Sequence, residues 1–290
     1  MTIVKSARAT PRMTAEEFRL LREFINGHSG IRIGDELRSI VERRLGERVV
    51  ALRMGSFREY YHFLCYHPRR HAELERTMEI LTTNETYFFR EWTQLRAFRS
   101  QVLPSLKENA AVRKSLTVWS AGCSSGEEVY SLAILIEESG LFDDWEVRVF
   151  GNDISRKVLH IARSGVYRES SFRAMPQGYE HFFTRTPEGR VVHPRIRSMC
   201  VFGHFNLLDQ ARVAIVGQVD AIFCRNVLIY FDKDSRRRLL ESFYERLHPG
   251  GYLMLGHSES LLHASTAFEL AHLHGDLAYR KPVSNQGEQR

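Results

Sequence analysis

The sequence has few cysteines and no long apolar run, and each of these absences excludes a class of protein. Its four cysteines are scattered, with no C-x-x-C pair, which argues against a zinc site and indicates reduced thiols. No stretch of eighteen or more apolar residues occurs, so we expect no membrane-spanning helix. The opening segment, "MTIVKSARATPRM", has basic residues but no apolar core and does not look like a secretory signal. We therefore expect a cytoplasmic protein without a bound metal.

The charge balance alone does not identify a partner. The chain has 290 residues, 43% of them hydrophobic and 26% charged, which suits one large or two ordinary globular domains. Its net charge of +6 is compatible with nucleic-acid binding. No arginine-rich tract, zinc-finger spacing or aromatic RNA-binding pattern supports that class, so a basic surface for an acidic protein partner is the alternative.

Residues 13–81 have helical periodicity, and we expect a small all-helical domain after a flexible arm at 1–12. Thr14 is placed to cap a helix whose apolar stripe includes Phe18, Leu21 and Ile25, and glycines close it. Three more helices are predicted over about 35–54, 57–67 and 71–81.

From residue 82 to about 280 the pattern changes to short apolar strands that alternate with helices. The predicted strands contain "LTVWSAG", "EVRVFGND", "VDAIFCRN" and "GYLMLGH". This alternation predicts a Rossmann-like α/β domain with a parallel sheet covered on both faces. A stretch at about 185–205 alternates with period two, which predicts an inserted small antiparallel β-subdomain. The tail 281–290 is expected to be disordered.

The turn "WSAGCSSGEE" follows the first predicted strand and opens a helix. Gly122 and Gly126 fit neither the dinucleotide fingerprint nor the phosphate-binding loop, and no lysine follows to meet a phosphate. Glu127 and Glu128 suit the positive end of the helix dipole but would repel a pyrophosphate placed there. The turn therefore favours a nucleoside without phosphates, one that carries positive charge.

Other polar residues follow the later strands, where ligands bind in open α/β sheets. Asp153 is placed to bind ribose hydroxyls, or alternatively to cap the next helix. Asn206 could contact a ligand or simply form a turn. Arg225 and Asn226 end a strand, and Tyr230 follows, either as a site residue or as a core aromatic with a surface hydroxyl.

The segment "NETYFFRE" (84–91) lies where the two predicted domains join. Its Asn84, Thr86 and Arg90 are spaced so that they could line one face of a helical turn. Arg90 could otherwise be an ordinary surface arginine.

Together, "NETYFFRE", "WSAGCSSGEEVYSLA", "GNDIS", "FNLL" and "FCRNVLIYFD" resemble, in order, the chemotaxis-receptor glutamate methyltransferases, the CheR family. The resemblance covers about Met13 to Arg280. It implies a class I methyltransferase sheet that uses S-adenosylmethionine and releases S-adenosylhomocysteine. The implied activity is methylation of glutamates on the cytoplasmic helical domain of chemoreceptors, which forms glutamyl 5-O-methyl esters in chemotaxis adaptation.

The resemblance also implies roles for individual residues. Arg90 and Tyr230 are the implied catalytic pair. By motif match, the implied cofactor contacts are Asn84, Thr86, Arg90, Glu128 (rather than Glu127), Asp153, Asn206, Leu207, Arg225 and Asn226.

The predicted helix at 35–54 carries the implied receptor-docking surface. Arg44 and Arg48 lie one turn apart and could meet acidic receptor helices, although the helix could equally be an ordinary solvated one. Family members that tether to a receptor's C-terminal pentapeptide do so through the inserted β-subdomain. Here that stretch, "TRTPEGRVVHPRIR", is short and has only Gly189, so we expect direct receptor recognition instead.

Two other functions remain open from the sequence. A nucleic-acid methyltransferase could use the same sheet, but base amino-methylators usually need an Asn/Asp-Pro-Pro-aromatic loop and this chain has no Pro-Pro pair. A non-catalytic protein that senses S-adenosyl ligands and docks to a partner is the second alternative, and the presence of Arg90 and Tyr230 argues against it.

Overall fold

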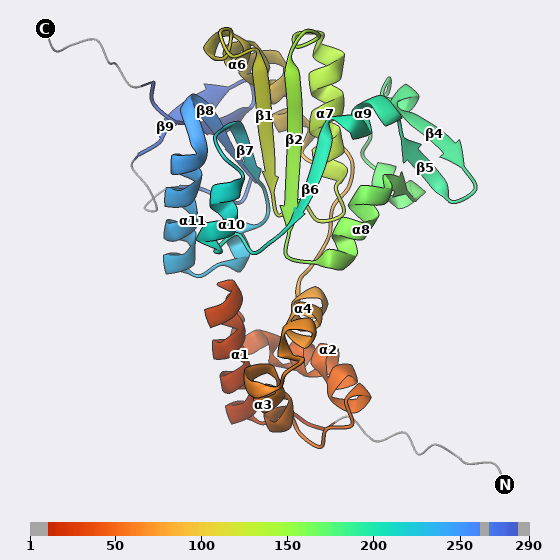
Figure 1. Cartoon of the computed structure of the whole chain (residues 1–290), viewed down its shortest axis with the longest axis vertical. Coiled ribbons are helices and arrows are strands. Elements are labelled where there is room, and N and C mark those ends of the chain that lie inside the picture. The colour runs from red at the N-terminus through yellow and green to blue at the C-terminus, as the bar shows by residue number, and fades with distance from the viewer. Residues whose placement is uncertain (1–10, 262–266, 284–290) are drawn as a thin grey trace, which may run out of the picture. The chain divides into compact units, whose positions relative to one another are not determined.

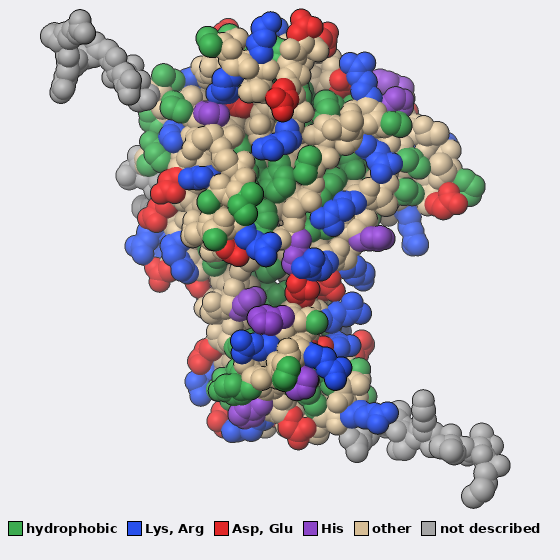
Figure 2. Space-filling model, in the orientation of Figure 1, with side chains coloured by type: hydrophobic (Ala, Val, Ile, Leu, Met, Phe, Trp, Pro, Cys, Tyr) green, Lys and Arg blue, Asp and Glu red, His purple; other side chains and the backbone are tan. Residues whose placement is uncertain are grey.

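The computed structural model describes residues 11–261 and 267–283, and it divides into two units at the boundary between Thr83 and Asn84 (Figure 1). The predicted arm and tail lie largely outside the described residues. Within the described ranges, every helix is too short or too polar to cross a lipid bilayer. On the face shown in Figure 2, blue basic and red acidic side chains are mixed over both units, so on that face the positive charge is not gathered into a single patch.

Unit 1 is all-helical in its described part, which confirms this element of the predicted fold. Its helices are α1 (Ala15–Ser29), the 3-10 turn η1 (Asp35–Leu37), α2 (Arg38–Ala51), α3 (Phe57–Tyr66) and α4 (Arg70–Leu81). Thr14 begins α1 with a capping box, because its hydroxyl accepts the Glu17 N–H at 3.2 Å and the Glu17 carboxylate accepts the Thr14 N–H at 2.8 Å. Gly30 ends α1 in the left-handed conformation.

Arg44 and Arg48, the predicted receptor contacts, both bond within unit 1. Arg44 donates to the carbonyls of Ile80 and Leu81 at the end of α4, at 3.2 and 3.0 Å. Arg48 donates two parallel hydrogen bonds, of 2.9 and 2.7 Å, to the buried carboxylate of Glu73 on α4. The two arginines therefore hold α2 against α4, a role that the sequence did not reveal, and the receptor contact stays a prediction.

Unit 2 contains a seven-stranded mixed sheet in the order β6-β2-β1-β7-β8-β10-β9. The strands are β6 (Cys200–His204), β2 (Glu146–Asp153), β1 (Ser115–Ala121), β7 (Val219–Cys224), β8 (Leu247–Leu255), β10 (Asp276–Arg280) and β9 (Glu269–Leu273). The first five run parallel, and β10 runs antiparallel to both β8 and β9. This order confirms the predicted Rossmann-like fold.

Helices cover both faces of this sheet, as the alternation along β1 requires. Leu116 and Val118 pack on one side with α6 and α7, whereas Trp119 and Ala121 pack on the other with α10 and α11. The helical elements of unit 2 are α5 (Trp92–Ala97), η2 (Phe98–Val102), α6 (Leu103–Asn109), α7 (Glu127–Ser139), α8 (Arg156–Ser164), η3 (Glu169–Phe172), η4 (Glu180–Phe182), α9 (Pro194–Ser198), α10 (Gln210–Ile215), η5 (Leu228–Tyr230) and α11 (Lys233–Arg246).

The inserted sheet differs in extent from the one predicted at about 185–205. It consists of β3 (Val166–Tyr167), β5 (Gly189–Val192) and β4 (Phe183–Thr186), in that order, and Figure 1 shows β4 and β5 beyond α9. The stretch 200–204 instead forms β6, which extends the main sheet parallel to β2. A period of two marks any half-buried strand, so the sequence pattern could not assign this strand to one sheet or the other.

Replacing Arg48 with alanine should destabilise the protein, because it leaves the buried Glu73 carboxylate without its charged donor. We expect the free energy of unfolding to fall by about 2 kcal/mol, measured by urea denaturation followed by far-ultraviolet circular dichroism. Arg43→Ala, at an exposed position on the same helix, is the matched control and should change it by less than about 0.5 kcal/mol. Equal losses in the two variants would contradict a structural role for Arg48.

Candidate functional site

The candidate site lies at the carboxyl ends of the central strands. β1 has β2 on one side and β7 on the other, and the sheet continues outward from each. The strand order therefore reverses between β1 and β7, which is the place where open α/β sheets bind ligands. The segments that follow β1, β2 and β7 carry most of the residues that the sequence singled out.

The turn after β1 is tight, and its backbone conformation and close contacts explain why glycine occupies positions 122 and 126. Gly122 and Gly126 both have positive φ, and a Cβ at Gly122 would lie 2.7 Å from a methyl carbon of Val227 in the loop after β7. The N–H groups of Gly122 and Cys123 donate to the Asn152 carbonyl at 2.9 and 2.8 Å. The turn is thus fastened to the end of β2, close to the loop after β7.

Asp153, predicted to bind ribose, ends β2 in a buried position. Its carboxylate accepts the N–H groups of Ser124 and Ser155, each at 2.9 Å. Burial raises the pKa of Asp153 above its ordinary value, and the hydrogen bonds from backbone N–H groups only partly oppose this. Ser155, not Asp153, is the N-cap of α8, so the helix-capping alternative is not the one adopted.

Residues 84–91 were predicted to place Asn84, Thr86 and Arg90 on one face of a helical turn, and this is wrong. The segment has no regular secondary structure from Asn84 to Tyr87 and then turns, with Phe89 and Glu91 at φ of 57° and 56°. Two aromatic side chains impose this path, since Phe88 and Phe89 are fully buried in the core of unit 2. Helical periodicity could not foresee burial of two consecutive residues.

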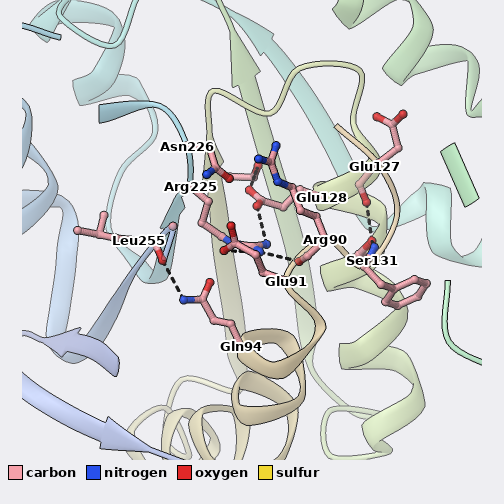
Figure 3. A network of polar contacts seen from close by, with 12 residues as sticks. Arg90, Glu91, Gln94, Glu127, Glu128, Ser131, Arg225, Asn226 and Leu255 are labelled. Atoms are coloured by element: carbon pink, nitrogen blue, oxygen red, sulfur yellow. Dashed lines mark hydrogen bonds and ion pairs between the residues drawn. The ribbon is translucent and has the colours of Figure 1, made fainter. Parts of the chain in front are cut away.

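Arg225 lies at the centre of a buried ion network (Figure 3). Only 2% of its side chain is exposed, and it forms ion pairs of 3.0 Å with both Glu91 and Glu128. It also donates to the main-chain carbonyl of Arg90 at 2.6 Å. Burial would raise the pKa of Glu91, but the charge and hydrogen bond of Arg225, together with the charges of His257 and Arg90, hold that pKa below its ordinary value.

The structure distinguishes Glu128 from Glu127. Glu128 accepts from Ser120 at 2.7 Å and faces Arg225, at the end of β1. Glu127 is buried and is directed away from Arg225, where it accepts from the hydroxyls of Ser125 and Ser171 (Figure 3). Only Glu128 thus belongs to the network at the switch point.

The surroundings of the two predicted catalytic residues, Arg90 and Tyr230, differ from those of Arg225. The Arg90 guanidinium donates to the Glu85 carbonyl at 3.0 Å and lies over the Tyr87 ring at 5.7 Å. Tyr230 lies in η5 and is about one-third exposed. Among the described residues, the side chains of Tyr230 and Thr86 bond to none of the other predicted site residues.

The remaining predicted contacts lie around the same edge of the sheet. The Asn84 carbonyl accepts from Ser124 at 3.3 Å, which brings segment 84–91 to the turn after β1. Asn206 accepts the Leu208 N–H at 3.0 Å in the loop after β6, beside the buried Leu207. Asn226 follows β7 with φ of 59°.

Comparison with known proteins agrees with this geometry. Residues 84–275 match the family model described as CheR methyltransferase, SAM binding domain, and residues 16–82 match CheR methyltransferase, all-alpha domain. Chemotaxis protein methyltransferase 2 of Vibrio cholerae is 34% identical over 96% of this chain and 97% of its own. Chemotaxis protein methyltransferase 2 of Pseudomonas aeruginosa is 39% identical over 87% and 89%, and chemotaxis protein methyltransferase of Escherichia coli is 35% identical over 87% of each.

The chain belongs to the CheR methyltransferase family. It is an S-adenosylmethionine-dependent methyltransferase, and residues 84–275 form the domain that binds this cofactor.

The switch point of this CheR protein fits S-adenosylmethionine. Asn226 Oδ1 and Arg225 Nε are buried there without a partner among the described residues, so they are available to a ligand. The acidic side chains of Glu128 and Asp153 border the turn, which suits a sulfonium cation and a ribose rather than phosphate groups. Glu128, Asp153, Arg225 and Asn226 are therefore the residues that would hold the cofactor.

Sequence reasoning missed two carboxylates of this CheR site. Glu91 ends the segment 84–91, but its pairing with Arg225 links residues 134 positions apart in sequence. Glu259 follows β8 and accepts main-chain N–H groups from the loop after β7. Its position just after a predicted strand was the one signal that could have indicated it.

Cofactor affinity should fall as pH is lowered, because protonation removes the charge of Asp153 and turns one of its two acceptor oxygens into a donor. Burial raises its pKa, so it loses its charge at a higher pH than an exposed aspartate. We expect the Kd for S-adenosylhomocysteine, measured by calorimetry, to increase as the pH is lowered, and to begin doing so at a higher pH than an exposed aspartate would cause.

Asp153→Asn is the control and should bind about tenfold more weakly near pH 7, with a flatter pH dependence. A pKa raised in the folded state adds stability as pH falls, so this group's titration does not itself unfold the protein. The same pH dependence in the variant and the wild type would contradict the role of Asp153.

Proposed function

We propose that this methyltransferase acts on glutamate side chains in the cytoplasmic helical domain of chemoreceptors. The product would be a glutamyl 5-O-methyl ester, formed in the cytoplasm during chemotaxis adaptation. The proposal is supported by the family to which the chain belongs and by relatives whose names describe chemotaxis protein methyltransferases.

One observation carries the choice of a carboxylate acceptor, namely the contrast between two neighbouring arginines. The charge of Arg225 is held by Glu91 and Glu128, whereas the guanidinium of Arg90 donates to a neutral carbonyl. Among the described residues, Arg90 has no carboxylate within ion-pair distance. Its planar fork is therefore suited to bind an incoming carboxylate with two hydrogen bonds.

The proposed chemistry requires placement more than proton transfer. A glutamate has a reference pKa of about 4.3 and is ionised near neutral pH, so its oxygen needs no general base. When bound, S-adenosylmethionine supplies a methyl group activated by a sulfonium centre. Arg90 would orient the attacking carboxylate, and the hydroxyl of Tyr230, a residue about one-third exposed, would donate a hydrogen bond to it. Such positioning can contribute up to roughly 7–11 kcal/mol.

Arg44 and Arg48 stay the proposed receptor contacts, although both also have a structural role. Both hold α2 against α4, so charge reversal there would alter the helical unit itself. Receptor recognition without a tethering peptide also stays part of the proposal, because the β4–β5 hairpin is short.

The nature of the methylated product tests the proposal directly. The protein is incubated with methyl-labelled S-adenosylmethionine and a chemoreceptor cytoplasmic fragment, and the product is treated with mild base. We expect the label to be released as methanol, which identifies an ester. Label that stays on the fragment, or that enters added nucleic acid instead, would refute it, as would the absence of any transfer.

Arg90→Ala and Tyr230→Phe should lower turnover far more than cofactor affinity, because both side chains act on the acceptor. We expect kcat to fall about 100-fold for Arg90→Ala and somewhat less for Tyr230→Phe, with Kd for S-adenosylhomocysteine changed less than about threefold. Arg96→Ala, an exposed arginine in α5, is the matched control and should retain wild-type turnover. Near-normal kcat in both test variants would remove these roles.

A further inference from the structure

Glu259 lies just after β8 and binds the main chain of the neighbouring loop. Its carboxylate accepts the N–H groups of Asn226 at 2.7 Å, Gly256 at 3.0 Å and Ile229 at 3.2 Å. Two of these donors belong to the loop after β7 and one to the end of β8. A single half-buried carboxylate thus joins the carboxyl ends of two adjacent parallel strands.

The main chain packs closely around the Glu259 carboxylate. A Cβ at Gly256 would lie 2.9 Å from the Asn226 main-chain nitrogen and 3.0 Å from a carboxylate oxygen of Glu259. Only glycine therefore permits the end of β8 to approach the loop this closely. The Glu259 N–H donates to the Gly256 carbonyl at 2.8 Å, which closes a tight turn and aims the side chain inward.

The loop held by Glu259 carries residues assigned to the reaction. Asn226 is in the left-handed region, with φ of 59°, a conformation that costs free energy in a residue with a side chain. Tyr230 lies directly after Ile229, whose N–H is one of the three donors. The hydrogen bonds at Asn226 and Ile229 therefore restrain the main chain from which the side chains of Asn226 and Tyr230 project.

We infer that Glu259 is a positioning residue for methyl transfer, which holds Asn226 and Tyr230 in their working geometry through three main-chain hydrogen bonds. The inference rests on the roles proposed above for those two residues. A carboxylate suits this task because it accepts from several donors at once, whereas a glutamine amide would turn an N–H toward at least one main-chain N–H.

The test measures Glu259→Gln in the full chain. We expect kcat for the receptor fragment to fall about tenfold and Kd for S-adenosylhomocysteine to rise about tenfold, while the receptor KM stays within about twofold. Glu241→Gln, an exposed glutamate in α11, is the matched control and should match the wild type. Wild-type kcat and Kd in Glu259→Gln would overturn the inference, and so would a change confined to the receptor KM.

A double-mutant cycle distinguishes positioning from general destabilisation. Because Glu259 acts partly through Tyr230 and partly through Asn226, Glu259→Gln should lower kcat by a smaller factor in a Tyr230→Phe background than in the wild type. The full loss in that background would overturn the inference. The calorimetric measurement needs no receptor, so it remains decisive even if the methyl acceptor proves not to be glutamate.

If Glu259→Gln does not fold, a second variant, Gly256→Ala, tests the inference instead. Gly256→Ala places a methyl group against the Asn226 nitrogen and lengthens its bond to Glu259. It should weaken S-adenosylhomocysteine binding and lower kcat in the same direction. Unchanged values in Gly256→Ala would then overturn the inference.

Discussion

The burial of Arg225 is the interaction on which the geometry of the site depends. A guanidinium that is 2% exposed is stable only when its charge is matched, and here Glu91 and Glu128 supply two carboxylates. These three residues come from the segment before α5, the first turn of α7 and the end of β7. Their pairing therefore holds three separate pieces of the chain at one edge of the sheet.

The two arginines near this network differ in whether their charge is paired with a carboxylate. Arg225 is paired with the carboxylates of Glu91 and Glu128, and Glu128 together with Asp153 gives the turn after β1 an acidic border. The main-chain carbonyl of Arg90 accepts from Arg225, whereas its guanidinium donates to the Glu85 carbonyl and forms no ion pair among the described residues. An acidic border for a sulfonium donor and an available guanidinium for an anionic acceptor are the two requirements of carboxyl methylation.

Unusual backbone conformations concentrate around the same edge. Phe89, Glu91, Ser124 and Asn226 all have positive φ although none is glycine. Each such residue costs free energy that the surroundings must offset. The buried Phe88 and Phe89 offset it in segment 84–91, and hydrogen bonds from Ser124 to Asp153 and from Asn226 to Glu259 do so in the turns. The strained residues are thereby held in place before any ligand binds.

The sequence by itself determined the local elements, because their signals are local. The capping box at Thr14, the strand–helix alternation and the acidic turn after β1 depend on residues a few positions apart. The tertiary structure decided which distant parts of the chain these elements contact. It assigned Cys200–His204 to the main sheet, gave 84–91 a non-helical path, paired Arg48 with Glu73 and brought Glu259 to Asn226. Such choices depend on contacts between residues far apart in sequence, and neither periodicity nor spacing records which distant surface a side chain will meet.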